Sequence, residues 1–320
     1  GWLGIAIPEQ YGGAGLGLRE VVPVVEQMGR ALMASPFVST TLAAQALLAG
    51  GTDKQKQALL PQIAGGAIAT LALMEPHGDW NLENLTAQAR DEGKDRIALS
   101  GEKILVCDAA AADWVIVSLR YRDAPALIAI GKADLPREAL RREIVVDETK
   151  RAYFIKLDGI VVGAETLLDV SRARETLAHI HLAANLLSTA EMCGGAQSAI
   201  DYTVDYLKTR KQFGKLIGSY QALKHPIVAA YVAYEQARSH LYSAAFCFDE
   251  QGTGEIATRM ARVQTETVFS HAADRAIQFH GGFGFTYDCD AQLYRRRALW
   301  HASQFGDAIY HKRKLADLLL

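Results

Sequence analysis

The spacing of apolar residues changes its period twice along this 320-residue chain, and this change constrains the fold more than any other feature. Within residues 18–33 the apolar side chains recur at intervals of three and four, the spacing of one buried helix face, at Val21, Val25, Met28 and Leu32. Short runs rich in β-branched residues follow, and long helical patterns then return. We therefore predict an α+β fold with an N-terminal helical domain (1–66), a middle antiparallel β-sandwich or barrel (67–170) and a C-terminal four-helix bundle (171–320).

Turn and capping residues mark the other helices of the N-terminal part. A second helix is expected over Ser39–Leu48, because two glycines that can adopt a left-handed cap follow it. Thr52 or Asp53 can cap a third helix, and Pro61 is expected to close it.

The middle part contains short strand-like runs separated by turn residues such as Ser100-Gly101 and Asp158-Gly159. The predicted strands are Ala69–Met74, Arg96–Leu99, Ile104–Val106, Trp114–Leu119, Leu127–Ile130, Ile144–Val146, Tyr153–Leu157 and Ile160–Val162. Many short strands without long helices between them favour an antiparallel arrangement over a parallel sheet of βαβ units.

The C-terminal part has the pattern of four long helices. They are expected from Ser171 to about Thr209, over Ala222–Glu250 with Pro226 tolerated near the start, over Glu255–Phe279 and over Leu293–Leu320.

The charge balance and the cysteine positions exclude several classes of function. The 34 basic residues nearly cancel the 36 acidic ones without a long run of either sign, so we expect no nucleic-acid surface and no basic membrane patch. No stretch reaches the ~18 apolar residues of a membrane span, so no membrane insertion is expected. The four cysteines lie far apart without a C-x-x-C pair, so neither a disulfide framework nor a metal site is expected. With no recognisable signal peptide, the sequence favours a cytoplasmic protein.

Four separate segments, each containing glycine, stand out along the chain. They read GWLGIAIPEQYGGAGLG (1–17), GTDKQKQALLPQIAGG (51–66), YLKTRKQFGKLIGSYQALKH (206–225) and QFHGGFGFT (278–286). Together they resemble the acyl-CoA dehydrogenase family of flavoproteins, whose first helices would precede Gly1. The resemblance implies FAD-dependent α,β-dehydrogenation of an acyl-CoA thioester, with an acceptor such as an electron-transfer flavoprotein. It also implies a homodimer or tetramer, or a heterotetramer with a related subunit as in two-subunit members of the pimeloyl-CoA dehydrogenase type.

Two of these segments have the residue types that a dinucleotide needs. A pyrophosphate favours a guanidinium, which Arg210 can supply, and close backbone approach, which glycine permits. The resemblance implies that these segments reach the FAD of a neighbouring subunit through Arg210, Gln212, Phe213, Gln221, Gln278, Gly281 and Gly282. The residues alone leave another reading open, because Arg-Lys-Gln-Phe-Gly is also a common helix end and Gly-Gly a common turn.

The flavin ring is expected against the β domain. The resemblance assigns it backbone donors at Leu73 and Met74, with Met74 standing where the family has a threonine. Cys107 stands where the family has a second hydroxyl. Each missing hydroxyl bond costs about 0.5–1.5 kcal/mol, so flavin binding is expected to be weakened or retuned.

The sequence places no acid where the family has its catalytic base. The usual glutamate position is occupied by Phe305 or Gln304, depending on the alignment anchor, and the alternative position on the first bundle helix by Ala184. Glu191, two turns beyond, is a weak candidate base, and pairing with a bundle arginine is the favoured alternative. Asp307 is expected to cap the last helix, and a bond to the adenosine end of the cofactor is the less favoured alternative. A second hypothesis follows: a catalytically silent or poor subunit whose glutamate comes from a partner chain.

Overall fold

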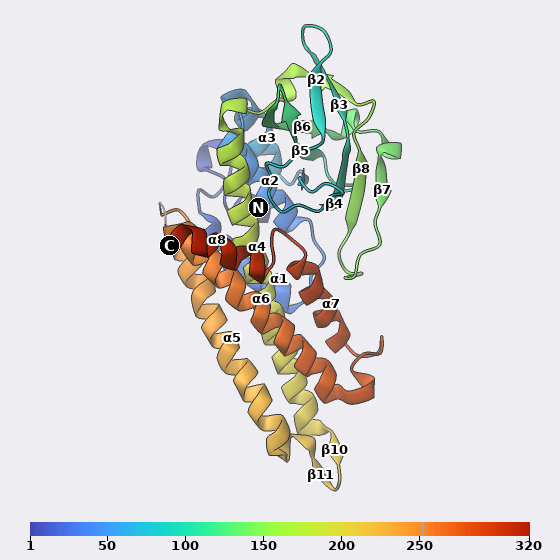
Figure 1. Ribbon diagram of the computed structural model, residues 1–320, viewed down its shortest axis with the longest axis vertical. Helices are drawn as coiled ribbons and strands as arrows, with labels where there is room; N and C mark the ends of the chain where they lie inside the picture. The colour runs from blue at the N-terminus through green and yellow to red at the C-terminus, as the bar shows by residue number, and fades with distance from the viewer. Residues whose placement is uncertain (251–252) are drawn as a thin grey trace. The chain divides into compact units, whose positions relative to one another are not determined.

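The computed structural model describes residues 1–250 and 253–320, whose elements are labelled in Figure 1. The chain forms two compact units. Unit 1 consists of Gly1–Glu20, Ala34–Val145 and Lys150–Ala184, and unit 2 of Val21–Met33, Val146–Thr149 and Asn185–Leu320. The element order is helical, then β, then helical, as the sequence predicts. The bounds of the three predicted domains stay a prediction.

Unit 1 begins with the short helices η1 (Trp2–Gly4) and η2 (Glu9–Tyr11), and it also contains the helices α2 (Phe37–Gly50) and α3 (Asp53–Ala64). Thr52 caps α3 as predicted, in a reciprocal capping box with Gln55. The prediction that Pro61 closes this helix was wrong, because α3 continues to Ala64. Ile63 in that last turn is fully buried, and its packing compensates for the hydrogen bond that the proline cannot donate.

Two sheets follow in unit 1. The six-stranded sheet has the order β1-β5-β2-β3-β9, with β6 pairing β5, and the three-stranded sheet has the order β4-β8-β7. The strands are β1 (Ala69–Ala72), β2 (Gln88–Asp91), β3 (Arg96–Ser100), β4 (Glu102–Cys107), β5 (Trp114–Tyr121), β6 (Ala124–Gly131), β7 (Leu140–Arg142), β8 (Ala152–Lys156) and β9 (Val161–Gly163). The pairing is mostly antiparallel as predicted, but β5 pairs in parallel with both β1 and β2. Apolar side chains of both sheets share one core.

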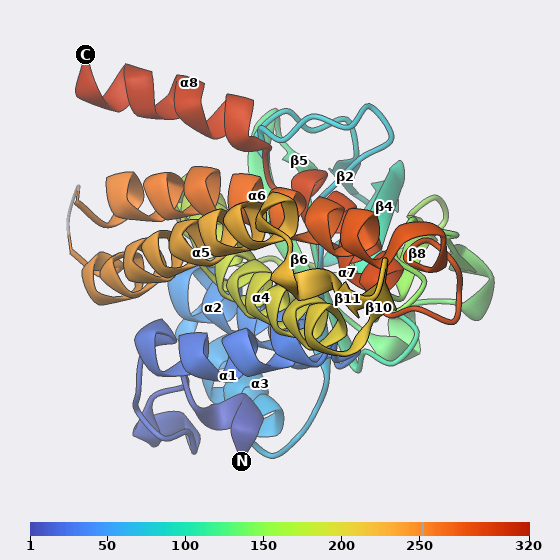
Figure 2. The same cartoon turned by 90° about the horizontal axis from the view of Figure 1, so that it is seen from below.

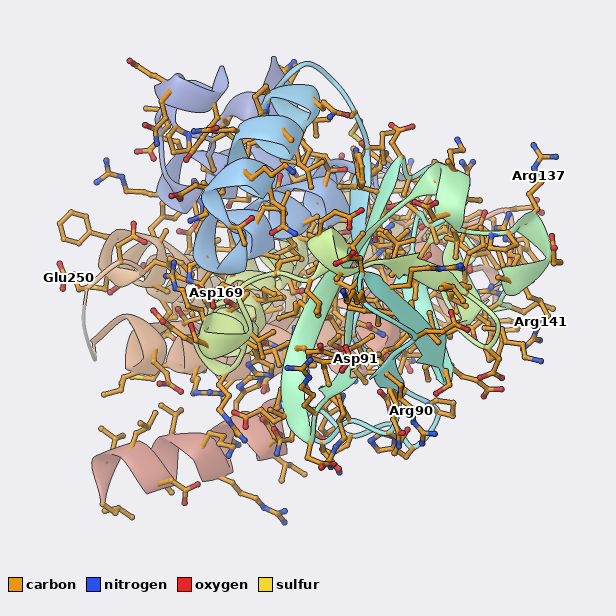
Figure 3. All side chains as sticks on the ribbon, turned by 90° about the horizontal axis from the view of Figure 1, so that it is seen from above. Arg90, Asp91, Arg137, Arg141, Asp169 and Glu250 are labelled. Atoms are coloured by element: carbon orange, nitrogen blue, oxygen red, sulfur yellow. The ribbon has the colours of Figure 1, made fainter. Side chains whose placement is uncertain are left out.

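Two strand assignments differ from the sequence-based prediction. β2 was missed, because in Gln-Ala-Arg-Asp only Ala89 is buried while Arg90 and Asp91 are exposed at the strand end (Figure 3). The strand predicted at Ile144–Val146 was wrong, since that segment is irregular and Ile144 is fully exposed. Neighbouring residues, Leu140–Arg142, form β7 instead. The side-chain pattern of one short segment does not reveal which residues find a partner strand.

Unit 2 is helical and contains the small hairpin β10 (Lys211–Gln212) and β11 (Lys215–Leu216). Its helices are α1 (Leu18–Arg30) from Val21 onward, α4 (Ala173–Thr209) from Asn185 onward, α5 (Gln221–Cys247), α6 (Thr253–His280), α7 (Ala291–Ala302) and α8 (Ala308–Leu319). In Figures 1 and 2, α5 and α6 run side by side. Phe269 of α6 packs closely against Gly195 of α4.

The fourth predicted helix, Leu293–Leu320, is interrupted between α7 and α8. Phe305 has a φ of +54° and Gly306 a φ of +100°, and a right-handed helix accommodates neither. Asp307 then starts α8 by accepting a hydrogen bond from the Tyr310 backbone N–H, so the cap role predicted for it is confirmed. Among the described residues, no helix is both long enough and apolar enough to cross a membrane.

Candidate functional site

The first group of predicted residues lies in unit 1, where the chain leaves β1 beside β4. Leu73 and Met74 are buried there. The Ile104 N–H donates to the Met74 carbonyl at 3.0 Å, which joins this segment to β4. The Thr70 hydroxyl donates to the Cys107 carbonyl at 2.6 Å. The structure therefore brings Leu73, Met74 and Cys107 to one place, as expected of residues that would contact one ligand.

A bulge distorts β4 at this place. The register with β8 shifts between Lys103 and Val106, and Leu105 has a φ of +54°. The Leu105 N–H points to Glu143, whose Oε2 accepts it at 2.7 Å. A bulged strand re-aims its side chains, and a bulky residue with positive φ persists only where its surroundings hold it.

A buried ion pair supports the same segment. The Lys103 ammonium, fully buried, donates to Glu75 Oε1 at 2.8 Å, to the Ser118 hydroxyl at 3.1 Å and to the Leu73 carbonyl at 3.3 Å. Burial alone would raise the pKa of Glu75, but Lys103 and hydrogen bonds from Thr86 outweigh it and lower that pKa. Burial lowers the pKa of Lys103 to about 8, so both groups are ionised at pH 7.

The second group of predicted residues lies in unit 2, around the β10–β11 hairpin. Phe213 and Gly214 form its tip with φ of +52° and +74°. This is the conformation of a tight type I′ turn, which suits glycine and disfavours phenylalanine. Phe213 is also 90% exposed. Arg210 and Gln212 are exposed before the tip, and Gln221 is exposed as the first residue of α5.

Stacked aromatic rings connect this hairpin with the end of α6. The His280 ring stacks on Tyr206, four residues before Arg210, at 4.2 Å and on Tyr202 at 4.8 Å. Gln278 is exposed on the last turn of α6, and the short helix η8 (Gly281–Phe283) follows. The structure thus brings Arg210 and the glycine pair to the same end of the bundle.

The glycine pair leaves room for a ligand. A Cβ at Gly281 or Gly282 would meet nothing within 4 Å, and only Gly281 has a positive φ, +63°. Packing within the chain therefore does not explain Gly282. His280 Nε2 is buried without a hydrogen-bond partner in the described part of the chain. An exposed guanidinium, open glycine backbone and an unsatisfied ring nitrogen fit a polyanionic dinucleotide such as FAD.

The positions considered for a base hold no free carboxylate among the described residues. Ala184 is buried in α4, and Gln304 is buried in the α7–α8 loop. Phe305 is half-buried in the same loop. Glu191 is buried and bonded to the guanidinium of Arg297. Whether Glu191 takes part in catalysis stays a prediction.

Arg297 is the centre of a buried charge network that the sequence analysis missed. It is fully buried and contacts the carboxylates of both Glu191 and Asp147. It also donates to the Thr149 hydroxyl at 2.6 Å. His301 Nε2 lies 3.5 Å from Glu191. No group of three or more His, Cys, Asp or Glu in residues 1–250 and 253–320 is arranged to hold a metal ion.

Two further buried cations, Lys103 and Arg262, were also missed. A signal was present for Arg262, because Glu266 follows it by one helical turn and Phe269 lies on the same face. No comparable signal exists for Lys103, because its partner Glu75 lies 28 residues away in the chain.

Comparisons with known proteins agree on one family. The acyl-CoA dehydrogenase N-terminal domain matches residues 1–67, and the acyl-CoA dehydrogenase C-terminal domain matches residues 181–318. Acyl-CoA dehydrogenase FadE12 of Mycobacterium tuberculosis is 32% identical over 308 residues, covering 89% of this chain and 76% of the relative.

Comparison with solved structures also finds close structural similarity over the whole chain. A chain of the ChsE4-ChsE5 complex from Mycobacterium tuberculosis is 25% identical with a TM-score of 0.87, covering 99% of this chain and 84% of that one. A chain from the structure of an electron transferring flavoprotein of Acidaminococcus fermentans is 25% identical with a TM-score of 0.91, covering 100% and 87%.

Proposed function

Because the chain belongs to the acyl-CoA dehydrogenase family, a family of flavoprotein oxidoreductases, we propose that it binds FAD and oxidises an acyl-CoA thioester at the α,β position. The observation that carries the FAD assignment is the end of the bundle in unit 2. There an exposed Arg210 accompanies the glycine pair Gly281-Gly282, which packing within the chain does not explain. A bound flavin would supply the hydride acceptor.

Each unit of the chain would contribute its own residues to cofactor binding. Arg210 offers two parallel N–H donors to the pyrophosphate, and the backbone at Gly281 and Gly282 can approach it without Cβ interference. Leu73 and Met74 would face the flavin ring from unit 1, with Cys107 beside them. The bulge and the buried Lys103–Glu75 pair support the backbone of that segment.

We also propose that a neighbouring subunit completes the site. A phenylalanine that is 90% exposed at a strained hairpin tip is unfavourable for an isolated chain, and contact with a second subunit would bury it. The likeness to a chain of the ChsE4-ChsE5 complex supports an assembly of this kind. The acceptor would be an electron-transfer flavoprotein, and the cytoplasmic location stays a prediction.

A second candidate function is a silent or poor subunit of a heteromeric acyl-CoA dehydrogenase. The positions of the family's base hold Phe305, Gln304 and Ala184, and the nearby Glu191 is bonded to Arg297. In this case a partner chain would supply the glutamate.

Replacing Arg210 by alanine tests the cofactor assignment. A hydrogen bond to a charged group contributes about 1.5–3 kcal/mol, so the dissociation constant for FAD should rise about 10- to 100-fold. Calorimetric titration of FAD into the apoprotein measures this change. Lys208→Ala removes an exposed cation from the last turn of α4 and should leave the affinity unchanged. Equal affinities of the Arg210→Ala variant and the parent protein would refute the role of Arg210.

A further inference from the structure

The loop between α7 and α8 is held by one buried arginine from α6. Arg262 is fully buried. Its Nη2 donates to three backbone carbonyl oxygens, those of His301 at 2.5 Å, Gln304 at 3.2 Å and Gly306 at 3.0 Å. One guanidinium nitrogen therefore determines the path of the chain from the last turn of α7 to the start of α8.

Neighbouring side chains hold the remaining backbone of this loop. The Asn185 amide donates to the Phe305 carbonyl at 3.2 Å, and His311 Nε2 lies 3.1 Å from the same oxygen. Glu266 accepts from the Ala308 N–H at 3.2 Å and lies 3.4 Å from Arg262. The loop is thus bonded from α4, α6 and α8, far more than a simple connection requires.

This bonding maintains a strained conformation. Phe305 has a φ of +54°, which costs a residue with a Cβ roughly 1–2 kcal/mol. Gly306 has a φ of +100°, and a Cβ there would lie 2.4 Å from the Tyr310 ring. Backbone strain that the surroundings over-determine is found at ligand and active sites more than elsewhere.

The arginine itself is in an unfavourable environment. Its Nε has no hydrogen-bond partner in the described residues, and its carboxylate neighbour Glu266 is not in direct hydrogen-bond contact. Burial lowers the pKa of Arg262 to about 10, although Glu266 opposes this change. A buried charge of this kind is poor evidence for stability, and hydrophobic residues often replace such groups without loss. Its distinctive contribution is the set of three carbonyl bonds.

We propose that Arg262 is a positioning residue that holds Phe305 against the acyl chain of the bound thioester. It fixes the backbone of Gln304–Gly306, and the half-buried Phe305 ring is presented from that backbone. This inference rests on the proposed function, because Phe305 is one of the two residues, with Gln304, that the resemblance places at the position of the catalytic glutamate.

The experiment uses the full chain loaded with FAD and compares Arg262→Lys and Arg262→Met with Arg295→Lys. The control Arg295 pairs with Asp274 at 2.7 Å and donates to the Ser270 hydroxyl at 3.3 Å, and both of these partners lie on α6 and not in the loop. The rate of backbone amide hydrogen exchange measures how firmly residues 301–311 are held in their folded conformation. Perturbation of the flavin absorption spectrum by butyryl-CoA and octanoyl-CoA measures binding, and FAD content is recorded for each variant.

In Arg262→Met, exchange in 301–311 should be at least about tenfold faster and acyl-CoA binding at least about tenfold weaker, with FAD content unchanged. Arg262→Lys should restore part of the slow exchange and part of the acyl-CoA affinity, because an ammonium can still donate to some of the carbonyls. Arg295→Lys should match the parent protein. Faster exchange with unchanged acyl-CoA binding would show a purely structural arginine and overturn the proposal.

If the Arg262 variants do not fold, a second variant tests whether Phe305 contributes to acyl-CoA binding. Phe305→Ala leaves the backbone acceptors of the loop in place and removes the ring, so it should weaken acyl-CoA binding without faster exchange. Unchanged binding in Phe305→Ala would overturn the proposal. A parent protein that binds neither thioester would instead refute the proposed function for these substrates, and the positioning role with it.

Discussion

Replacing Arg297 by methionine should lower the free energy of unfolding by at least about 3–5 kcal/mol, the cost of breaking a buried ion pair. The side chain is fully buried between two carboxylates, Asp147 and Glu191, which are themselves almost fully buried. Methionine retains much of the apolar volume and removes every donor, so both carboxylates would be left without their cation. Urea unfolding followed by far-UV circular dichroism measures the change.

Two further variants define the cause of that loss. Arg295 lies on α7 like Arg297, and Arg295→Met breaks a more exposed pair with Asp274 of α6, which should cost no more than about 1 kcal/mol. Neutralising the acids in Asp147→Asn/Glu191→Gln/Arg297→Met should recover part of the lost stability, because no unpaired charge remains buried. An Arg297→Met protein as stable as the Arg295→Met control would contradict the network.

Replacing Lys103 by methionine should have the second large effect, a loss of about 3–5 kcal/mol at pH 7. The variant leaves Glu75 buried without its cation and leaves the Leu73 carbonyl with only the longer bond from the Ser118 hydroxyl, at 3.4 Å, of its two side-chain donors. The affinity for FAD should also fall, since Leu73 and Met74 lie on the segment that this pair supports. Unfolding and FAD titration are therefore measured on the same samples.

The pH dependence of the Lys103→Met defect has a defined sign. In the parent protein the pKa of Glu75 is lowered, so its contribution to stability is present above the unfolded-state pKa and is lost as the pH falls through the folded-state pKa. In the variant, burial without Lys103 raises that pKa, so protonation relieves the buried charge as the pH falls from 7 to 5. The difference in stability should therefore narrow on acidification.

The control for this prediction lies on the adjacent strand β8. Lys156 is exposed and lies 3.9 Å from Asp158, so Lys156→Met should change stability little at either pH. The double variant Lys103→Met/Glu75→Gln should regain stability. The assignment of Glu75 as the ionised partner would be contradicted if the difference in unfolding free energy between Lys103→Met and the parent protein widened on acidification.

Most of the fold could be predicted because its elements follow local apolar spacing. Val21, Val25 and Met28 are buried on one face of α1, and Thr52 caps α3, as their positions in the sequence suggest. The failures occurred where long-range contacts decide. β2 forms through pairing with β3 and β5 although its own residues are mostly polar. The break before α8 depends on bonds from Arg262 and Asn185, which lie 39 or more residues away in the chain.

The candidate residues themselves could be named from the sequence, whereas the buried charged groups that hold their segments in place could not. The motif residues Arg210, Gly281 and Gly282 occur at one end of the bundle, and Leu73, Met74 and Cys107 occur together in unit 1. The buried cations Lys103, Arg262 and Arg297 were missed, because charged residues are usually exposed and only the folded chain brings their partners to them. Lys103 and Arg297 find their carboxylate partners in other segments of the chain. The carbonyl acceptors of Arg262 follow α6, although Glu266 lies one turn after Arg262 on the same helix.

Anaerobic addition of acyl-CoA thioesters to the FAD-loaded chain tests the central claim most directly. We expect the purified chain to bind FAD, and its visible absorption to bleach with at least one of butyryl-CoA, octanoyl-CoA and a branched-chain thioester as the flavin is reduced. If bleaching requires a related chain that carries the missing glutamate, the heteromeric alternative is correct. A chain that binds no FAD, alone or with such a partner, and shows no bleaching with any of these thioesters would contradict the account.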